Sequence, residues 1–204
     1  MKFLARFFST ILHPLFMPYY GITLIFIFSY MQIYPAQIKL TVALSILGLT
    51  GLLPGIGIFA LYKFKQIQSV GLNNRKERLI PYLITVISYG SGAFFLYKVG
   101  MPYWVLAFVG GGILALLIDM AVNFGWKISA HMTGIGGLIG LALALSTIQS
   151  IFPQTLLVGL ILGAGILGTS RIYLDRHTFW QVIAGVLNGM VCVYWAILLT
   201  IRYL

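Results

Sequence analysis

The strongest constraint on the fold is a succession of apolar runs, each long enough to cross a lipid bilayer. A membrane-spanning helix needs about 20 mostly apolar residues, and this chain of 204 residues contains seven such runs. Only 8% of its residues are charged, whereas about a quarter are charged in soluble domains. The sequence therefore predicts an all-α, polytopic membrane helix bundle. The expected spans are 14–33, 38–62, 79–99, 102–124, 130–149, 154–172 and 178–201.

The rest of the chain indicates a single transmembrane domain over residues 1–204, because no polar linker or charge block divides it. Residues 1–13 are basic and apolar without a small-residue cleavage site, so we expect an amphipathic lead-in and not a removed signal. The net charge is +10, but the 13 lysines and arginines are spread between apolar runs. That spread favours lipid headgroups or phosphates as partners and argues against nucleic acid; it leaves the oligomeric state open.

Glycines recur at helical spacing within three of the expected spans. Such spacing allows transmembrane helices to approach each other closely, so we expect these glycines to lie at helix contacts. They are Gly134, Gly136, Gly137 and Gly140, then Gly159 with Gly163, then Gly185 with Gly189.

Charged residues and histidines gather on one predicted side of the membrane. With seven spans, the amino terminus and the connections after spans two, four and six share a side, which carries His13, His131 and His177. The positive-inside rule explains such a bias of lysines and arginines by a cytoplasmic location. Alternatively, the cations converge to bind phosphate, which would also give the histidines a role. The basic residues on this side are Lys2, Arg6, Lys63, Lys65, Arg75, Lys76, Arg78, Lys127, Arg171 and Arg176, against Lys39, Lys98 and Arg202 on the other.

Two polar features lie within or beside the apolar runs. The stretch from Ser170 to Gln181 is either an interfacial loop that anchors helix ends or a functional site, because charges held near the membrane core are costly without partners. In span four, Asp119, Asn123 and Lys127 follow at four-residue intervals and share a helix face. We expect these three residues and Asp175 to support a polar cavity. We also expect Asp119 to face inward and pair with Lys127, Arg171 or another polar group.

Three short motifs resemble those of the type 2 phosphatidic acid phosphatase superfamily. Ser170-Arg171, followed after five residues by His177, resembles the third signature, SRxxxxxHxxxD. Ser129-Ala130-His131 resembles the second, PSGH, and Arg75-Lys76-Glu77-Arg78 with Pro81 stands roughly where the first, KxxxxxxRP, belongs. The resemblance implies a six-helix phosphatase-like core over about residues 60–201, plus about one extra span.

The resemblance also implies a chemistry: a metal-independent enzyme without cofactor that hydrolyses a membrane lipid phosphate or diphosphate through a phosphohistidine. His177 would be the nucleophile and His131 the general acid. The phosphoryl oxygens would be held by side chains from all three motifs. These are Ser129, Ser170, Arg171 and one or more of Arg75, Lys76 and Arg78.

Several positions depart from the family pattern. The first motif is not matched, because its lysine is missing and Pro81 follows Arg78 by three positions. Gln181 replaces the acidic residue of the third motif. Its amide oxygen, one helical turn after His177, can still accept the imidazole N–H, with Asp175 as the competing acceptor. The altered first motif motivates an alternative: a non-catalytic lipid-phosphate binding or transport protein on the same fold.

One branch of the family carries a glutamine at the same place. The stretch from Tyr173 to Gly185 resembles the RxYLxxHTxxQVxxG pattern of dolichyl diphosphate phosphatases. The substrate implied is an isoprenyl diphosphate or a phospholipid phosphate such as phosphatidylglycerol phosphate. The expected location is a bacterial inner (plasma) membrane.

Overall fold

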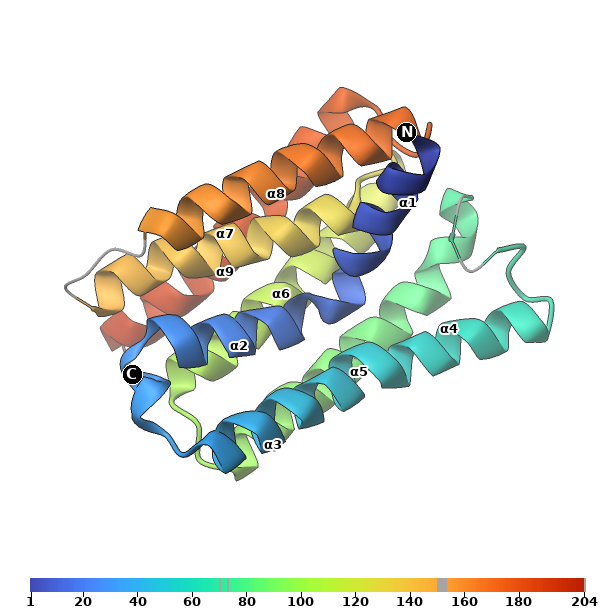
Figure 1. Cartoon of the computed structure of the whole chain (residues 1–204). Coiled ribbons are helices and arrows are strands. Elements are labelled where there is room, and N and C mark those ends of the chain that lie inside the picture. The colour runs from blue at the N-terminus through green and yellow to red at the C-terminus, as the bar shows by residue number, and fades with distance from the viewer. Residues whose placement is uncertain (70, 73, 150–153, 204) are drawn as a thin grey trace.

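The computed structural model describes residues 1–69, 71–72, 74–149 and 154–203, and this part of the chain is helical (Figure 1). Seven helical segments in it are long and apolar enough to cross a membrane, which confirms the predicted polytopic helix bundle. They are Lys2–Phe28, Ala36–Lys63, Leu79–Lys98, Tyr103–Asn123, Ala130–Ile148, Gln154–Tyr173 and Phe179–Tyr203.

The last five of these segments are single helices, whereas the first two are composite. The single helices are α5 (Leu79–Lys98), α6 (Tyr103–Asn123), α7 (Ala130–Ile148), α8 (Gln154–Tyr173) and α9 (Phe179–Tyr203). The first segment consists of α1 (Lys2–Ile11), a short 3-10 turn (Pro14–Phe16) and α2 (Met17–Phe28). The second consists of α3 (Ala36–Ile46), a π-helical turn (Leu47–Leu52) and α4 (Leu53–Lys63), and two further 3-10 turns cover Tyr30–Ile33 and Arg75–Arg78.

Prolines account for both interruptions. Pro14 disfavours helical geometry in the residue before it, and His13 is accordingly extended, with φ −72° and ψ 138°. Pro54 cannot donate the N–H that an ordinary helical turn requires, and the wide π turn directly precedes the helix in which it lies. The predicted first span, 14–33, differs from the structure at its carboxyl end as well, because α2 ends at Phe28.

The centre of the bundle is the contact between α7 and α9. A Cβ atom added to Gly189 would lie 1.9 Å from the Thr133 carbonyl oxygen, and one added to Gly136 would lie 2.2 Å from the Val186 carbonyl oxygen. The backbones therefore touch, as the glycine spacing predicts. Gly159 of α8 is different, because it has no atom within 4 Å of the added Cβ position. The prediction of close approach holds for α7 and α9 and is wrong for Gly159.

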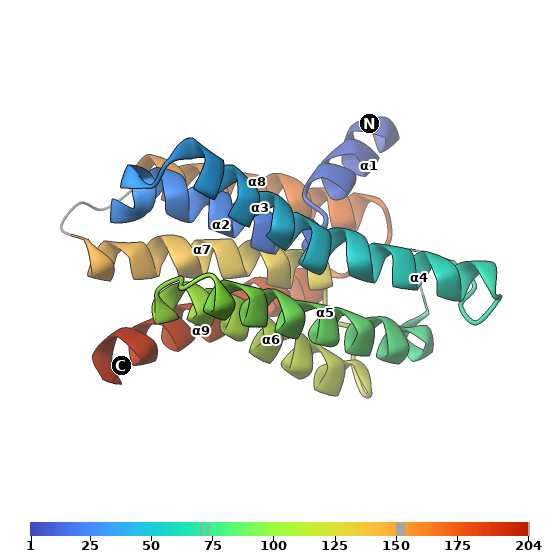
Figure 2. The ribbon, with the colours of Figure 1, turned by 90° about the horizontal axis from the view of Figure 1, so that it is seen from below.

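The outer helices pack around this centre. α6 lies against α9, where a Cβ on Gly111 would come within 2.7 Å of the Val193 Cα. α5 covers α6, α8 covers α7, and the α3–α4 segment runs beside α5 along one edge of the bundle (Figures 1 and 2). α1 leaves the direction of α2 and packs against α8, so that the amino terminus lies near the carboxyl end of α8 (Figure 1).

Candidate active site

A cavity of about 550 Å³ lies at the end of the bundle where α1 meets the carboxyl end of α8. Arg78, His131, Arg171 and His177 all line it, although they come from three separate connections of the chain. These four residues, one or two from each of the three motifs, are therefore brought together as expected, whereas their roles stay a prediction. The cavity is strongly basic, because its lining includes five cations and one carboxylate. The cations are Lys2, Arg6, Arg78, Arg171 and Arg176, and the carboxylate is Asp175.

His177 precedes α9 and is held by the first turn of that helix. Its Nδ1 lies 3.1 Å from Gln181 Oε1, and the backbone N–H of Thr178 donates to the same oxygen at 3.2 Å. A backbone N–H can only donate, so the shared atom must be the amide oxygen, and Nδ1 must carry its hydrogen. Nε2 then keeps its lone pair. The predicted partner of His177 is therefore confirmed as Gln181, while Asp175 lines the cavity nearby.

The surroundings of His177 keep its ring uncharged. Burial and, to a smaller extent, the positive charges of Arg171, Arg78 and Lys127 together lower the pKa of His177 from 6.5 to about 3, against a smaller opposing effect of the Gln181 hydrogen bond. Only 8% of the residue is exposed. At neutral pH, His177 is thus a neutral imidazole with a free Nε2, placed among cations.

Arg78 of the first motif lines the cavity, as does Pro81. It is buried, and its guanidinium donates from Nε to the Leu72 carbonyl at 2.9 Å and from Nη1 to the Ile128 carbonyl at 3.2 Å. Two backbone acceptors therefore fix its orientation. Arg75, which was also a candidate to hold phosphate, is not placed to do so. It is exposed, donates to the Gly125 carbonyl and does not line the cavity. The side chain of Lys76 lies outside the described part of the structure.

The two serines predicted to hold phosphate also need correction. Ser170 is buried and donates to the Ile166 carbonyl one turn earlier, at 2.7 Å. Ser129 is fully buried under the start of α9, where a Cβ on Gly185 would lie 2.7 Å from its carbonyl oxygen. Neither residue lines the cavity. Their neighbour Arg171 does, and its Nε is buried without a hydrogen-bond partner.

His131, at the start of α7, is covered by the amino-terminal segment. Its Nε2 lies 3.2 Å from the Ser9 carbonyl oxygen, and its ring meets the ring of His13 edge to face, with 5.0 Å between centroids. A carbonyl oxygen can only accept, so Nε2 carries a hydrogen. The motif resemblance gave no role to Lys2, Arg6, Ser9 or His13, all of which line the cavity. Lys2, Arg6 and Ser9 are spaced to share one face of a helix, and that spacing could have identified them from the sequence.

Asp119 belongs to a buried network beneath the cavity. Its Oδ1 accepts from Thr133 Oγ1 at 3.0 Å and from Asn188 Nδ2 at 2.8 Å, and the residue is fully buried. The expected inward orientation and polar pairing are confirmed. Asp119 does not line the basic cavity itself, but its partner Thr133 lines the smaller cavity next to it. Its partners Thr133 and Asn188 carried no recognisable sequence signal.

Asn123 shares the helix face of Asp119 as expected, but Lys127 does not, because α6 ends at Asn123; both residues hold backbone segments near the cavity. Asn123 donates from Nδ2 to the Arg75 carbonyl at 2.8 Å, and Lys127 donates from Nζ to the Arg176 carbonyl at 2.8 Å. Burial lowers the pKa of Lys127, and Arg78, Arg171 and Arg176 add to this shift. Both residues support the site through the connections that carry Arg78 and His177, and not by lining the cavity.

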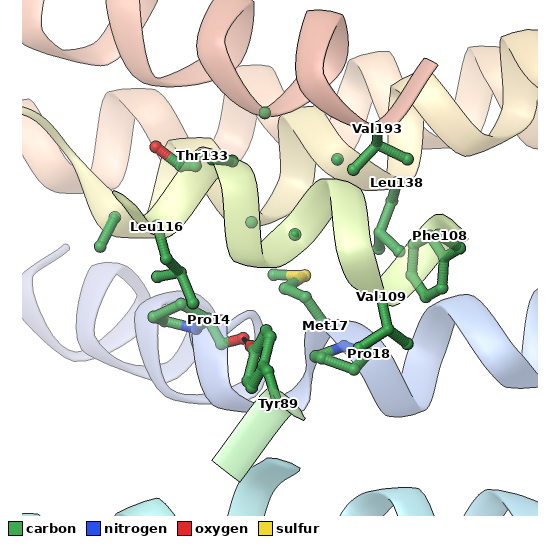
Figure 3. A pocket seen from close by; sticks show the side chains of 16 residues that line it. Pro14, Met17, Pro18, Tyr89, Phe108, Val109, Leu116, Thr133, Leu138 and Val193 are labelled. Carbon is green, nitrogen blue, oxygen red and sulfur yellow. Dashed lines mark hydrogen bonds between the residues drawn. The ribbon is translucent and has the colours of Figure 1, made fainter. Parts of the chain in front are cut away.

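A second cavity, of about 50 Å³, lies between α2, α5, α6 and α7 and is mainly apolar (Figure 3). Tyr89, Pro14 and Leu116 line both cavities, so the two are neighbours. Thr133 also lines the small cavity, with its hydroxyl donated to Asp119. The basic cavity therefore has apolar surroundings on its inner side.

No protein-family model, curated protein or solved structure matches this chain. Within the residues that the structure describes, no three or more His, Cys, Asp or Glu side chains are grouped to hold a metal ion.

Proposed function

We propose that this integral membrane protein is a lipid phosphatase that acts through a phosphohistidine on His177. The observation that carries the proposal is the state of that imidazole. It is neutral, its Nδ1–H is bonded to Gln181 and its Nε2 carries no hydrogen, and His177 lines a cavity together with Arg78 and Arg171. A nucleophile oriented by a second residue, beside fixed cations, is the arrangement that phosphoryl transfer requires.

In the proposed reaction, Nε2 of His177 attacks the terminal phosphorus and an N–P bond forms. The bond from phosphorus to the leaving oxygen breaks, and its electron pair stays on that oxygen. Arg78 and Arg171 stabilise the negative charge on the phosphoryl oxygens, while Gln181 accepts the Nδ1–H of the charged ring. Water then attacks the phosphohistidine, which releases inorganic phosphate and restores the neutral imidazole.

The proposed substrate is a long-chain lipid phosphate or diphosphate in a bacterial inner (plasma) membrane. Two features support a lipid. The cavity lies within a membrane helix bundle, and its inner side borders an apolar cavity. The basic lining supplies the counter-charge for a phosphate headgroup.

One observation favours a second candidate, a lipid-phosphate binding protein without catalysis. His131, the expected general acid, already donates Nε2–H to the Ser9 carbonyl. If that contact persists with substrate bound, no proton reaches a leaving alkoxide, and the cavity would hold the phosphate without cleaving it.

Phosphate release from lipids separates the two candidates. Purified protein in detergent, without added metal, is assayed with an isoprenyl diphosphate and with phosphatidylglycerol phosphate, with and without vanadate. A phosphatase gives vanadate-sensitive release that His177→Ala abolishes, whereas Lys39→Ala, at the opposite end of the bundle, retains it. Saturable lipid binding without any release would support the binding protein and end the phosphatase proposal.

A further inference from the structure

The amino-terminal helix presents one polar face to the basic cavity. Lys2, Arg6 and Ser9 follow at intervals of four and three residues, which places them on one face of α1, and His13 lines the same cavity from just beyond the end of the helix. The apolar side chains of α1 point elsewhere and are exposed, as suits contact with lipid. They are Phe3, Leu4, Phe7 and Ile11, with exposed fractions of 78%, 51%, 48% and 43%.

Contacts at the end of α1 place this face beside the reacting groups. The Ser9 carbonyl meets His131, and Ala5 and Ser9 are the buried residues of α1, which packs against α8. Arg6 lies three residues before Ser9, which is about 4.5 Å along a helix. The guanidinium of Arg6 can therefore extend over the space next to His131, and Lys2 lies one turn further out.

The cations of the cavity fall into two groups. Arg78 and Arg171 line the cavity together with His177, and their charges contribute to the lowering of its pKa. Lys2 and Arg6 line the same cavity from α1. Each group has beside it or within it a buried polar atom without a hydrogen-bond partner: Ser9 Oγ on α1 and Nε of Arg171 itself. Ser9 is only 7% exposed and lines the cavity, so an anion there would gain a buried donor.

We propose that Lys2, Arg6 and Ser9 form a second anion subsite, which binds the lipid-linked phosphate of a lipid diphosphate while His177 reacts with the terminal phosphate. This assignment rests on the proposed phosphatase function and names its substrate class. A terminal phosphate alone leaves the cations of α1 without a counter-charge. A diphosphate supplies negative charge to both groups.

The leaving group agrees with this assignment. When Nε2 of His177 bonds to the terminal phosphorus, the bond to the bridging oxygen breaks and its electrons remain on the lipid monophosphate. A phosphate of this kind has a second pKa near 6, so it leaves without needing a proton from His131. An alkoxide would need that proton, and the Nε2–H of His131 is occupied by Ser9.

A double variant, Lys2→Ala with Arg6→Ala, tests the subsite. Both residues are exposed, so their loss should leave the fold intact. The matched control is Lys39→Ala with Arg202→Ala, which removes the same two residue types at the other end of the bundle. Initial rates are measured with an isoprenyl diphosphate, the matching isoprenyl monophosphate and phosphatidylglycerol phosphate, and inhibition is measured with inorganic pyrophosphate and orthophosphate.

We expect the wild type to prefer the diphosphate. In the α1 variant, KM for the diphosphate should rise about 10–100-fold, as for the loss of charge-assisted hydrogen bonds, while KM for the monophosphate changes less than about threefold. Inhibition by pyrophosphate should weaken more than inhibition by orthophosphate. The control variant should behave as wild type.

Three other results of these assays would each refute a different part of the proposal. Equal effects on both isoprenyl substrates would refute the subsite and leave the phosphatase proposal standing. A wild-type preference for phosphatidylglycerol phosphate or for the monophosphate would refute the diphosphate assignment. Wild-type protein that releases phosphate from none of the three lipids would refute the phosphatase proposal itself.

Discussion

The two walls of the basic cavity are built in different ways. The core wall comes from α7, α8 and the connection before α9, and it carries His131, Arg171 and His177; α7 and α9 are in backbone contact through glycine. The amino-terminal wall comes from α1, which packs against α8 and exposes its apolar side. A nucleophile must be positioned within about 0.5 Å, whereas charges attract over several ångströms. The closely packed wall holds the proposed chemistry, and the exposed helix contributes charge.

The largest expected effect comes from separating α7 and α9. Gly189→Ala places a Cβ 1.9 Å from the Thr133 carbonyl oxygen, and neither backbone can yield cheaply. We expect the free energy of unfolding to fall by about 3 kcal/mol or more. This would be measured as a large fall in the thermal transition temperature and in the yield of folded protein. Gly159→Ala is the control, because that Cβ enters open space. Equal stability of the two variants would contradict the close backbone contact between α7 and α9 on which the core wall depends.

The next effect concerns the orientation of His177 within the core wall. Gln181→Ala removes the acceptor of Nδ1–H, and kcat for phosphate release should fall about 10–100-fold, the range for lost orienting hydrogen bonds. Gln181→Asp restores an acceptor and should retain activity or raise it. Asp175→Asn should have a small effect. A silent Gln181→Ala together with an inactive Asp175→Asn would transfer the orienting role to Asp175.

Acid should lower the free energy of unfolding, because His177 takes up a proton more readily in the unfolded chain. Its pKa falls from 6.5 to about 3 on folding, so the unfolded chain binds more protons between these pH values. The stability that this group contributes is complete above pH 6.5 and is lost as pH falls toward 3. We expect the transition temperature of ligand-free protein to fall between pH 7 and 4.5, and His177→Gln to reduce that fall. Identical pH profiles would contradict the neutral-imidazole assignment.

The smallest effect on activity is expected from Asp119, which lies behind both walls. Asp119→Asn keeps an oxygen to accept from Thr133 and Asn188, so kcat/KM should stay within about threefold of wild type. Thr133→Val removes one of the two donors to Oδ1 and should lower stability by about 1–3 kcal/mol, measured by thermal unfolding. A large loss of activity in Asp119→Asn would mean that the network acts on the site directly.

Much of the site could be predicted from local pattern. His177 and Gln181 are one helical turn apart, so their hydrogen bond depends on little beyond the start of α9. The directions in which side chains point were harder to predict from the sequence. Ser129 and Ser170 neighbour cavity residues in sequence, yet their hydroxyls are buried away from it, because the rotation of α7 and α8 is set by packing against neighbouring helices.

The sequence by itself determined the number of spans and the side on which the histidines gather, because apolar length and the alternation of sides are properties of the chain alone. It also predicted that the glycines of α7 and α9 lie at helix contacts, although only the structure shows that these two helices meet each other there. Only the tertiary structure decided that α1 folds back onto α8, so that Ser9 covers His131 and Arg6 enters the basic cavity. The physical reason is that Pro14 interrupts the helix without specifying its new direction. That direction follows from burying Ala5 and Ser9 against α8, a contact between residues more than 100 positions apart in the chain.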